Sequence, residues 1–109
     1  MADDEKIKNE LEKARTSRDK GNEGMARVCA RRAAGIAVRE YLQSKNIDPP
    51  ALNNFEILSD EKLLSYLPIE ITDHLNHLTM RVDENYNLPP EIDLIYDAEM
   101  VIQLLLKES

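Results

Sequence analysis

The chain contains two histidines, His74 and His77, three residues apart in a segment whose apolar spacing predicts a helix. Residues at that spacing share one helix face, and Asp73 stands beside His74 while Glu70 precedes it by one turn. Imidazole and carboxylate groups arranged in this way could hold a divalent metal ion. No cysteine adjoins the set, however, and histidine pairs are common on helix surfaces. We therefore expect no metal and no cofactor, and assign the histidines to the protein surface or to a contact with a partner.

Acid–base chemistry would need a second group next to His77. Arg81 follows one turn later, where its guanidinium could stabilise a phosphate. One histidine and one arginine do not make a catalytic set. The sequence also has no phosphate-binding glycine loop, no G-x-S-x-G nucleophile turn and no cysteine–histidine arrangement. We assign no catalytic residue and lean away from an enzyme, although the sequence alone does not decide this point.

A row of arginines, Arg27, Arg31 and Arg39, runs along the segment that predicts the longest helix. An arginine is costly to bury unless a carboxylate or a ligand pairs with it. Three kinds of partner stay open: the carboxylates of Asp97 and Glu99 on the last predicted helix, a second protein, or the phosphates of a nucleotide or RNA. The candidate ligand- or partner-binding residues are therefore Arg27, Arg31, Arg39, His77 and Arg81.

The helix that carries these arginines is expected over residues 24–43 and is apolar on most of its circumference. Such a helix is covered by neighbours on several sides. Small side chains form a continuous seam along it, at Ala26, Ala30, Ala33 and Ala37. The seam lets another helix approach closely, either inside a bundle or across a dimer.

Three further segments, over residues 3–20, 69–83 and 90–107, predict helices because their apolar residues recur at intervals of three and four. Ser59 followed by Asp60 and Glu61 signals the start of a short helix over residues 60–66, while residues 51–58 fit either a helical turn or irregular structure. No segment shows a pair of strands joined by a turn. We expect an all-α, up-and-down bundle of four to five helices.

Local signals mark where several of these helices begin and end. Gly21 is typical of the position just past a helix end, and Asn22 can cap the helix that follows. So short a link makes the first two helices an antiparallel hairpin. Pro68 and Pro90 suit the first turns of the last two helices.

The composition limits the size and the charge of any binding surface. With 109 residues, the chain fits a single domain, residues 1–109. Its net charge of −7 argues against a general nucleic-acid coat. The charge is uneven, because residues 1–45 hold 11 basic and 8 acidic side chains whereas residues 46–109 hold 3 and 13. The two halves either neutralise each other within the fold or leave a basic face for a ligand.

Two further features bear on the cellular compartment. The single cysteine, Cys29, offers no disulfide framework. The N-terminal segment has no apolar stretch typical of a signal peptide, and the sequence has no apolar run long enough to cross a bilayer. We expect a cytoplasmic protein with no membrane contact.

The segment Gly21–Leu42 resembles the second helix of domains of the HEPN superfamily, the nucleotide-binding-associated domains of higher eukaryotes and prokaryotes. A glycine, a helix of spaced alanines and a leucine-rich end carry the resemblance: Gly24, Ala26, Ala30, Ala33, Ala37 and Leu42. Three later groups are similar to the loop and last helix of many prokaryotic members: Leu78-Thr79-Met80-Arg81, Tyr86-Asn87-Leu88-Pro89 and Asp97-Ala98-Glu99.

This resemblance implies an up-and-down helical bundle, often dimeric, that works beside a minimal nucleotidyltransferase in toxin–antitoxin pairs or fused proteins. Ribonuclease members of the superfamily carry an arginine followed four to six residues later by a histidine, completed across the dimer. The present chain departs from that pattern, because both histidines precede Arg81 and no arginine has a histidine at that distance after it. The catalytic residues of the family have no matching positions here, so ribonuclease activity is not carried over.

The residues and the resemblance together predict a non-catalytic, HEPN-like interaction module. We expect a homodimer that binds a protein partner such as a minimal nucleotidyltransferase. Two alternatives stay open: a nucleotide- or RNA-binding protein that uses the arginine row, and a helical scaffold without a ligand.

Overall fold

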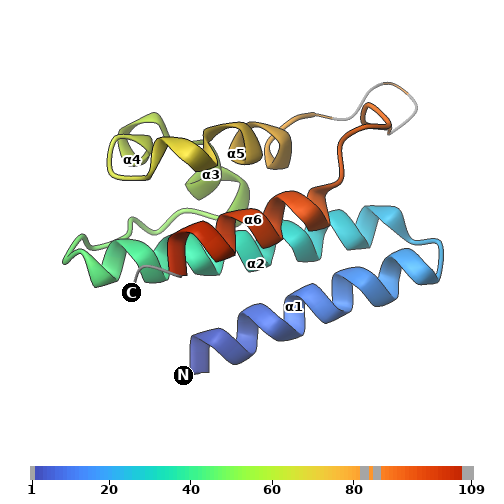
Figure 1. Cartoon of the computed structure of the whole chain (residues 1–109), viewed down its shortest axis with the longest axis horizontal. Coiled ribbons are helices and arrows are strands. Elements are labelled where there is room, and N and C mark those ends of the chain that lie inside the picture. The colour runs from blue at the N-terminus through green and yellow to red at the C-terminus, as the bar shows by residue number, and fades with distance from the viewer. Residues whose placement is uncertain (1, 82–83, 85–86, 107–109) are drawn as a thin grey trace.

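A computed structural model describes residues 2–81, 84 and 87–106, and only the backbone of residues 2 and 3. The described residues form six α-helices and one 3₁₀ turn (Figure 1). These elements are α1 Ala2–Asp19, α2 Glu23–Ser44, α3 Asn54–Ser59, α4 Glu61–Leu64, the 3₁₀ turn η1 Ile69–Ile71, α5 Thr72–Leu78 and α6 Leu94–Leu106. No strand occurs in this part of the chain, so the predicted all-α fold class is confirmed.

The helices alternate in direction along the long axis of the molecule, as an up-and-down bundle requires. Figure 1 shows α1 and α2 running in opposite directions, the chain running back from α4 through α5, and α6 running beside α2. The described residues form more helices than the expected four to five because the segment between α2 and α6 is divided into several short helices.

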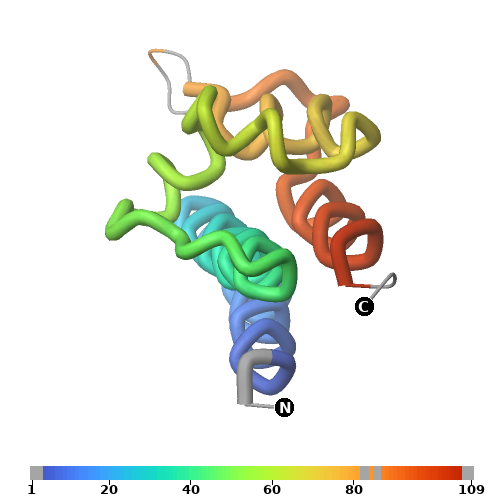
Figure 2. The backbone as a smooth tube through the Cα atoms, turned by 90° about the vertical axis from the view of Figure 1, so that its left-hand side faces the viewer, coloured from blue at the N-terminus to red at the C-terminus, as the bar shows by residue number. Residues whose placement is uncertain are grey.

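The helix α2 lies at the centre of this arrangement. It contacts α1, α3, α5 and α6, and Figure 2 shows α1 on one side of it and the short helices on the other. The alanine seam makes these contacts close, because Ala26, Ala30, Ala33 and Ala37 have no exposed surface. Since the chain's own helices cover the seam completely, it packs inside the bundle and offers no surface for a dimer.

The turn between α1 and α2 forms as the sequence predicts. Gly21 has a φ of +80°, a left-handed conformation that glycine adopts without strain. The side chain of Asn22 accepts a hydrogen bond from the Met25 amide at 3.1 Å and so caps α2. The hairpin of α1 and α2 is therefore set by local sequence.

Local capping also accounts for the two shortest helices. Residues 51–58, which fit two structures in the sequence, contribute to α3, and Asn53 and Glu56 form a reciprocal capping box at its start. The carboxylate of Asp60 accepts hydrogen bonds from two amides at the start of α4. The helix signal expected at residue 59 therefore falls one residue later, on Asp60.

The predicted helix over residues 69–83 is too long. It begins as the 3₁₀ turn η1, and α5 ends at Leu78. The hydroxyl of Thr79 donates to the Leu75 carbonyl at 2.8 Å, and the Met80 amide bonds only three residues back, to His77. These bonds tighten and end the last turn. Residues 82–83 of the predicted helix lie outside the described residues.

The last helix begins at Leu94 and not at residue 90. The carboxylate of Asp93 accepts hydrogen bonds from the amides of Ile95 and Tyr96, at 3.0 and 3.3 Å, so that Asp93 and not Pro90 defines the start. The predicted end of this helix, at residue 107, lies outside the described residues. The new start matters because it places Asp97 in the first turn of α6.

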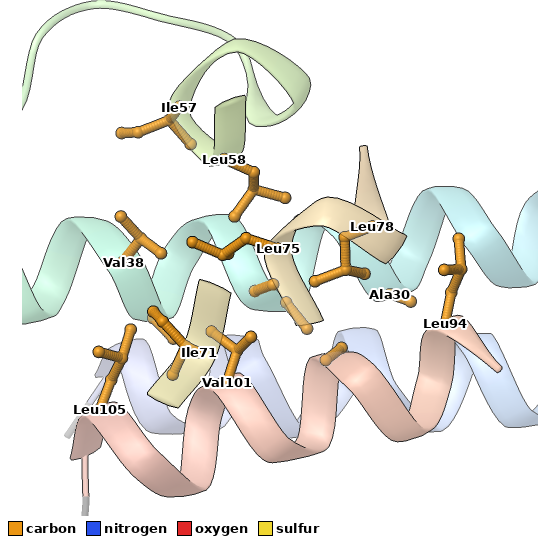
Figure 3. Packing of buried hydrophobic residues seen from close by; sticks show 14 of the residues in the cluster. Ala30, Val38, Ile57, Leu58, Ile71, Leu75, Leu78, Leu94, Val101 and Leu105 are labelled. Atoms are coloured by element: carbon orange, nitrogen blue, oxygen red, sulfur yellow. The ribbon is translucent and has the colours of Figure 1, made fainter. Parts of the chain in front are cut away.

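One cluster of buried aliphatic side chains fills the space between α2, the short helices and α6. Figure 3 shows Val38 of α2, Leu75 of α5 and Val101 of α6 converging in it.

Cys29 lies among the buried residues, and burial raises the pKa of its thiol, with Glu10 adding to the effect. Among the described residues, no helix has both the length and the apolar character that a bilayer crossing needs.

Candidate functional site

Both histidines of α5 contact one carboxylate of α6. His74 Nδ1 lies 2.7 Å from Asp97 Oδ1, and His77 Nδ1 lies 3.1 Å from each oxygen of the same carboxylate. The three-residue spacing of the histidines turns both rings toward α6. The structure therefore joins His74, His77 and Asp97 into one cluster between α5 and α6.

Asp97 is the most unusual member of the cluster because its charge is buried. Only 4% of its side chain is exposed, against 19% for His74 and 35% for His77. It is the one buried charged residue in the described part of the chain. A buried carboxylate needs hydrogen bonds or a cation to replace its lost hydration. The two imidazoles supply hydrogen bonds, and the N-terminal end of α6 favours a negative charge at this position.

Packing and one capping bond hold α5 against the bundle. The buried side chains of Leu75 and Leu78 fix the face that α5 turns to the core. The Arg31 guanidinium of α2 donates to the Leu78 carbonyl at 2.6 Å, which caps the C-terminal end of α5. Tyr96 of α6 packs edge-on against the His74 ring, with 6.0 Å between ring centroids. Three helices thus position the cluster.

The sequence indicates the histidine pair but not Asp97, the third residue of the cluster. Asp73 and Glu70, which adjoin the histidines in the sequence, are exposed. Asp97 is twenty residues further along the chain than His77, and nothing in the local sequence indicates that the two meet. The only available signal was a carboxylate on the α6 face that also carries core residues.

Of the partners that the sequence leaves open for the arginine row, the carboxylates of α6 do not pair with Arg31 or Arg39 in the described residues. Asp97 contacts the histidines, and Glu99 pairs with Arg15 of α1. Arg31 and Arg39 instead donate to backbone carbonyls, of Leu78 and Leu52 respectively. An arginine on a half-buried helix face can be satisfied by the unpaired carbonyls of helix ends and loops, which a sequence does not reveal.

Arg39 belongs to a tight junction between α2 and α3. Its guanidinium also donates to Asn54 Oδ1 at 2.8 Å. Asn54 in turn lies over Gly35 of α2, where an added Cβ would stand 2.5 Å from the Asn54 oxygen. Burial lowers the pKa of both Arg31 and Arg39, and nearby Arg27 adds to the effect at Arg31. These two arginines therefore serve the architecture.

The remaining candidates do not join the cluster. Arg27 lies 4.0 Å from the carboxylate of Glu23, one turn earlier on α2. Arg81 is exposed and its guanidinium lies 5.6 Å from the centre of the Phe55 ring. His77 belongs to the cluster through its bonds to Asp97, and Arg81 contacts Phe55 instead of His77.

A shallow groove of about 220 Å³ runs between α1 and α6, on a different part of the molecule. Apolar side chains line it from both helices: Ile7, Leu11, Ile102 and Leu106. Three charged residues of α1 also line it: Asp4, Lys8 and Arg15. This lining has the mixture of apolar surface and charge that protein interfaces use.

Comparison with known protein families, with curated proteins and with solved structures finds no match to this chain. The resemblance to HEPN domains accordingly rests on the residues and motifs named from the sequence, and it stays a prediction.

Proposed function

We propose that this protein is a non-catalytic, HEPN-like interaction module that forms a homodimer and binds a protein partner. The resemblance implies a minimal nucleotidyltransferase of a toxin–antitoxin pair as that partner, in the cytoplasm. The observation that carries the proposal is the apolar groove between α1 and α6.

A second copy of this chain fits the groove because the charges along it have both signs. A twofold interface presents the same surface to itself, so a surface that carries both signs can pair with its own copy. Asp4 and Lys8 supply the two signs, while Arg15 already pairs with Glu99 of the same chain. The apolar side chains between them would supply the buried centre of the interface.

The RNA-binding alternative receives less support from the arginine row. The guanidinium groups of Arg31 and Arg39 are engaged with carbonyl groups of the chain, so a phosphate would have to displace them. Binding of RNA that falls steeply with salt would still identify phosphate contacts. The alternative stays a prediction that such a titration tests.

The dimer is tested by sedimentation equilibrium of the full chain over a range of concentrations up to high micromolar. We expect the wild-type chain to dimerise and Ile102→Glu to be monomeric, because the new carboxylate would be buried in the interface. Gln103→Glu is the matched control, since Gln103 is exposed and does not line the groove.

A second variant guards against a folding defect. Lys8 is exposed, so Lys8→Glu should leave the helical circular dichroism unchanged while it weakens the dimer through charge repulsion. A wild-type chain that is monomeric at every concentration would overturn the homodimer. Equal association of the wild type, Ile102→Glu and Lys8→Glu would overturn the assignment of the groove.

A further inference from the structure

The cluster of His74, His77 and Asp97 brings three metal-ligating groups to one point. One donor atom from each residue lies within 4.8 Å of the other two. The set holds two imidazole nitrogens and one carboxylate oxygen, a combination that binds Zn²⁺ and related transition metals. Mg²⁺ and Ca²⁺ prefer oxygen ligands alone, so the donor chemistry selects against them.

The distances in the cluster are close to those of a coordination shell. Bond lengths of about 2.0–2.1 Å and a tetrahedral angle place neighbouring ligand atoms roughly 3.3 Å apart. The Nδ1 atoms of His74 and His77 lie 2.7 and 3.1 Å from Asp97 Oδ1. These two distances are within about 0.6 Å of that value, and all three donor atoms lie within 4.8 Å of one another.

The buried charge of Asp97 supplies a reason for a cation at this position. Within the described residues, its carboxylate bonds to the two imidazoles and to no lysine or arginine. With neutral imidazoles, hydrogen bonds and the N-terminal end of α6 stabilise that negative charge, but no full positive charge among the described residues balances it at a site with 4% exposure. A divalent ion would compensate the charge while the same three side chains stay in place.

We infer that His74, His77 and Asp97 bind one divalent transition-metal ion of the Zn²⁺ class. His74 and His77 bind it through Nδ1 in their neutral form, so each ring releases the Nδ1 proton that it donates to Asp97 in the metal-free chain and takes up one on Nε2. Asp97 binds it through a carboxylate oxygen. Three protein ligands leave the fourth position of a tetrahedral ion open, and the partly exposed His77 places that position toward solvent. The ion joins α5 to α6.

Calorimetric titration of the full chain with Zn²⁺ tests this inference directly. The chain should carry no histidine tag and should be treated with a chelator beforehand. The chain has only two histidines, and the cluster contains both of them. We expect one saturable site per chain for Zn²⁺ and none for Mg²⁺. His74→Ala and His77→Ala should each weaken Zn²⁺ binding by at least about 100-fold, because outer-shell changes alone cost roughly 10- to 100-fold.

Asp73→Asn is the matched control, because Asp73 adjoins His74 but is exposed and lies outside the cluster. It should leave Zn²⁺ affinity within about twofold of the wild type, as expected for a surface change. No saturable Zn²⁺ binding by the wild type would overturn the inference. Unchanged affinity in His77→Ala would overturn it as well.

A second measurement needs no variant. Paramagnetic Co²⁺ added to the isotope-labelled wild-type chain should broaden amide signals of α5 and of the first turns of α6 before all others, since the ion would sit between them. Broadening that is uniform, or that begins at the acidic residues of α1, would contradict the assignment of the site.

Discussion

The helix α6 packs against two neighbours in different ways. It contacts the alanine-rich helix α2, and its apolar residues Ala98, Val101 and Leu105 are almost completely buried. Toward α5 it presents Asp97, whose carboxylate meets two imidazoles. The first contact needs no explanation beyond apolar burial and close packing. The second places a charge where an apolar side chain would pack at lower cost.

This difference separates architecture from a candidate function. The contact between α2 and α6 stabilises the fold by itself. The contact between α5 and α6 is held in position by the rest of the bundle, including the Arg31 bond to the Leu78 carbonyl. Groups that are kept together at a cost to stability are typical of binding sites. Substitutions on each side should therefore have effects of different kinds.

The largest loss of stability is expected on the apolar side. Leu105 is 1% exposed, so Leu105→Ala should lower the free energy of unfolding by about 2–5 kcal/mol. Chemical denaturation followed by circular dichroism measures the change. A loss below about 1 kcal/mol would show that the α2–α6 contact is loosely packed, which would weaken the comparison.

Replacing the polar cluster between α5 and α6 by apolar side chains should not lower the stability of the fold. In the presence of a chelator, the triple variant His74→Leu/His77→Leu/Asp97→Val should be as stable as the wild type or more stable by up to about 4 kcal/mol, because apolar groups replace a buried charge. The same denaturation assay reports it. A marked destabilisation would show that the cluster serves the fold.

Arg31 connects the two sides, since it reaches from α2 to the end of α5. Arg31→Met keeps much of the apolar stem but removes the bond to the Leu78 carbonyl, so we expect a loss of about 1–2 kcal/mol. Hydrogen exchange should show the loss chiefly in α5. Protection that stays unchanged in α5 would mean that its position depends on apolar packing alone.

The smallest effect concerns the junction of α2 with α3. Gly35→Ala would place a methyl group 2.5 Å from Asn54 Oδ1, so the Asn54 bond to Arg39 must shift and stability should fall by about 1 kcal/mol. Gly24→Ala is the control, because its nearest neighbour would lie at an ordinary 3.8 Å. That variant should gain about 0.4–1 kcal/mol. Thermal unfolding of both variants should show a lower Tm for Gly35→Ala and a higher Tm for Gly24→Ala than for the wild type.

The sequence predicted the elements that depend on local signals. The central helix, its buried alanine seam and the turn at Gly21–Asn22 all follow from patterns within a few residues. Helix ends were predicted less well where a side chain sets them, as Asp93 does at the start of α6 and Thr79 does at the end of α5.

Of the candidate site, the sequence predicted the histidine pair but not the carboxylate that the two histidines contact. The spacing of His74 and His77 placed them on one helix face, but their partner Asp97 lies on a separate helix. For the same reason the sequence left the partners of the arginine row open, and Arg31 and Arg39 bond to the carbonyls of Leu78 and Leu52. Contacts between distant segments depend on the packing of whole helices, and a single sequence carries no direct record of them.

Thermal unfolding with and without Zn²⁺ tests most directly whether the α5–α6 cluster is a binding site. A ligand that binds only the folded chain adds about 2.7 kcal/mol of stability at 100 times its Kd. For a chain of 109 residues this corresponds to a rise in Tm of roughly 10 °C. We predict that rise for the wild type and none for the triple variant His74→Leu/His77→Leu/Asp97→Val. The same Tm for the wild type with Zn²⁺ and with a chelator would contradict the metal site.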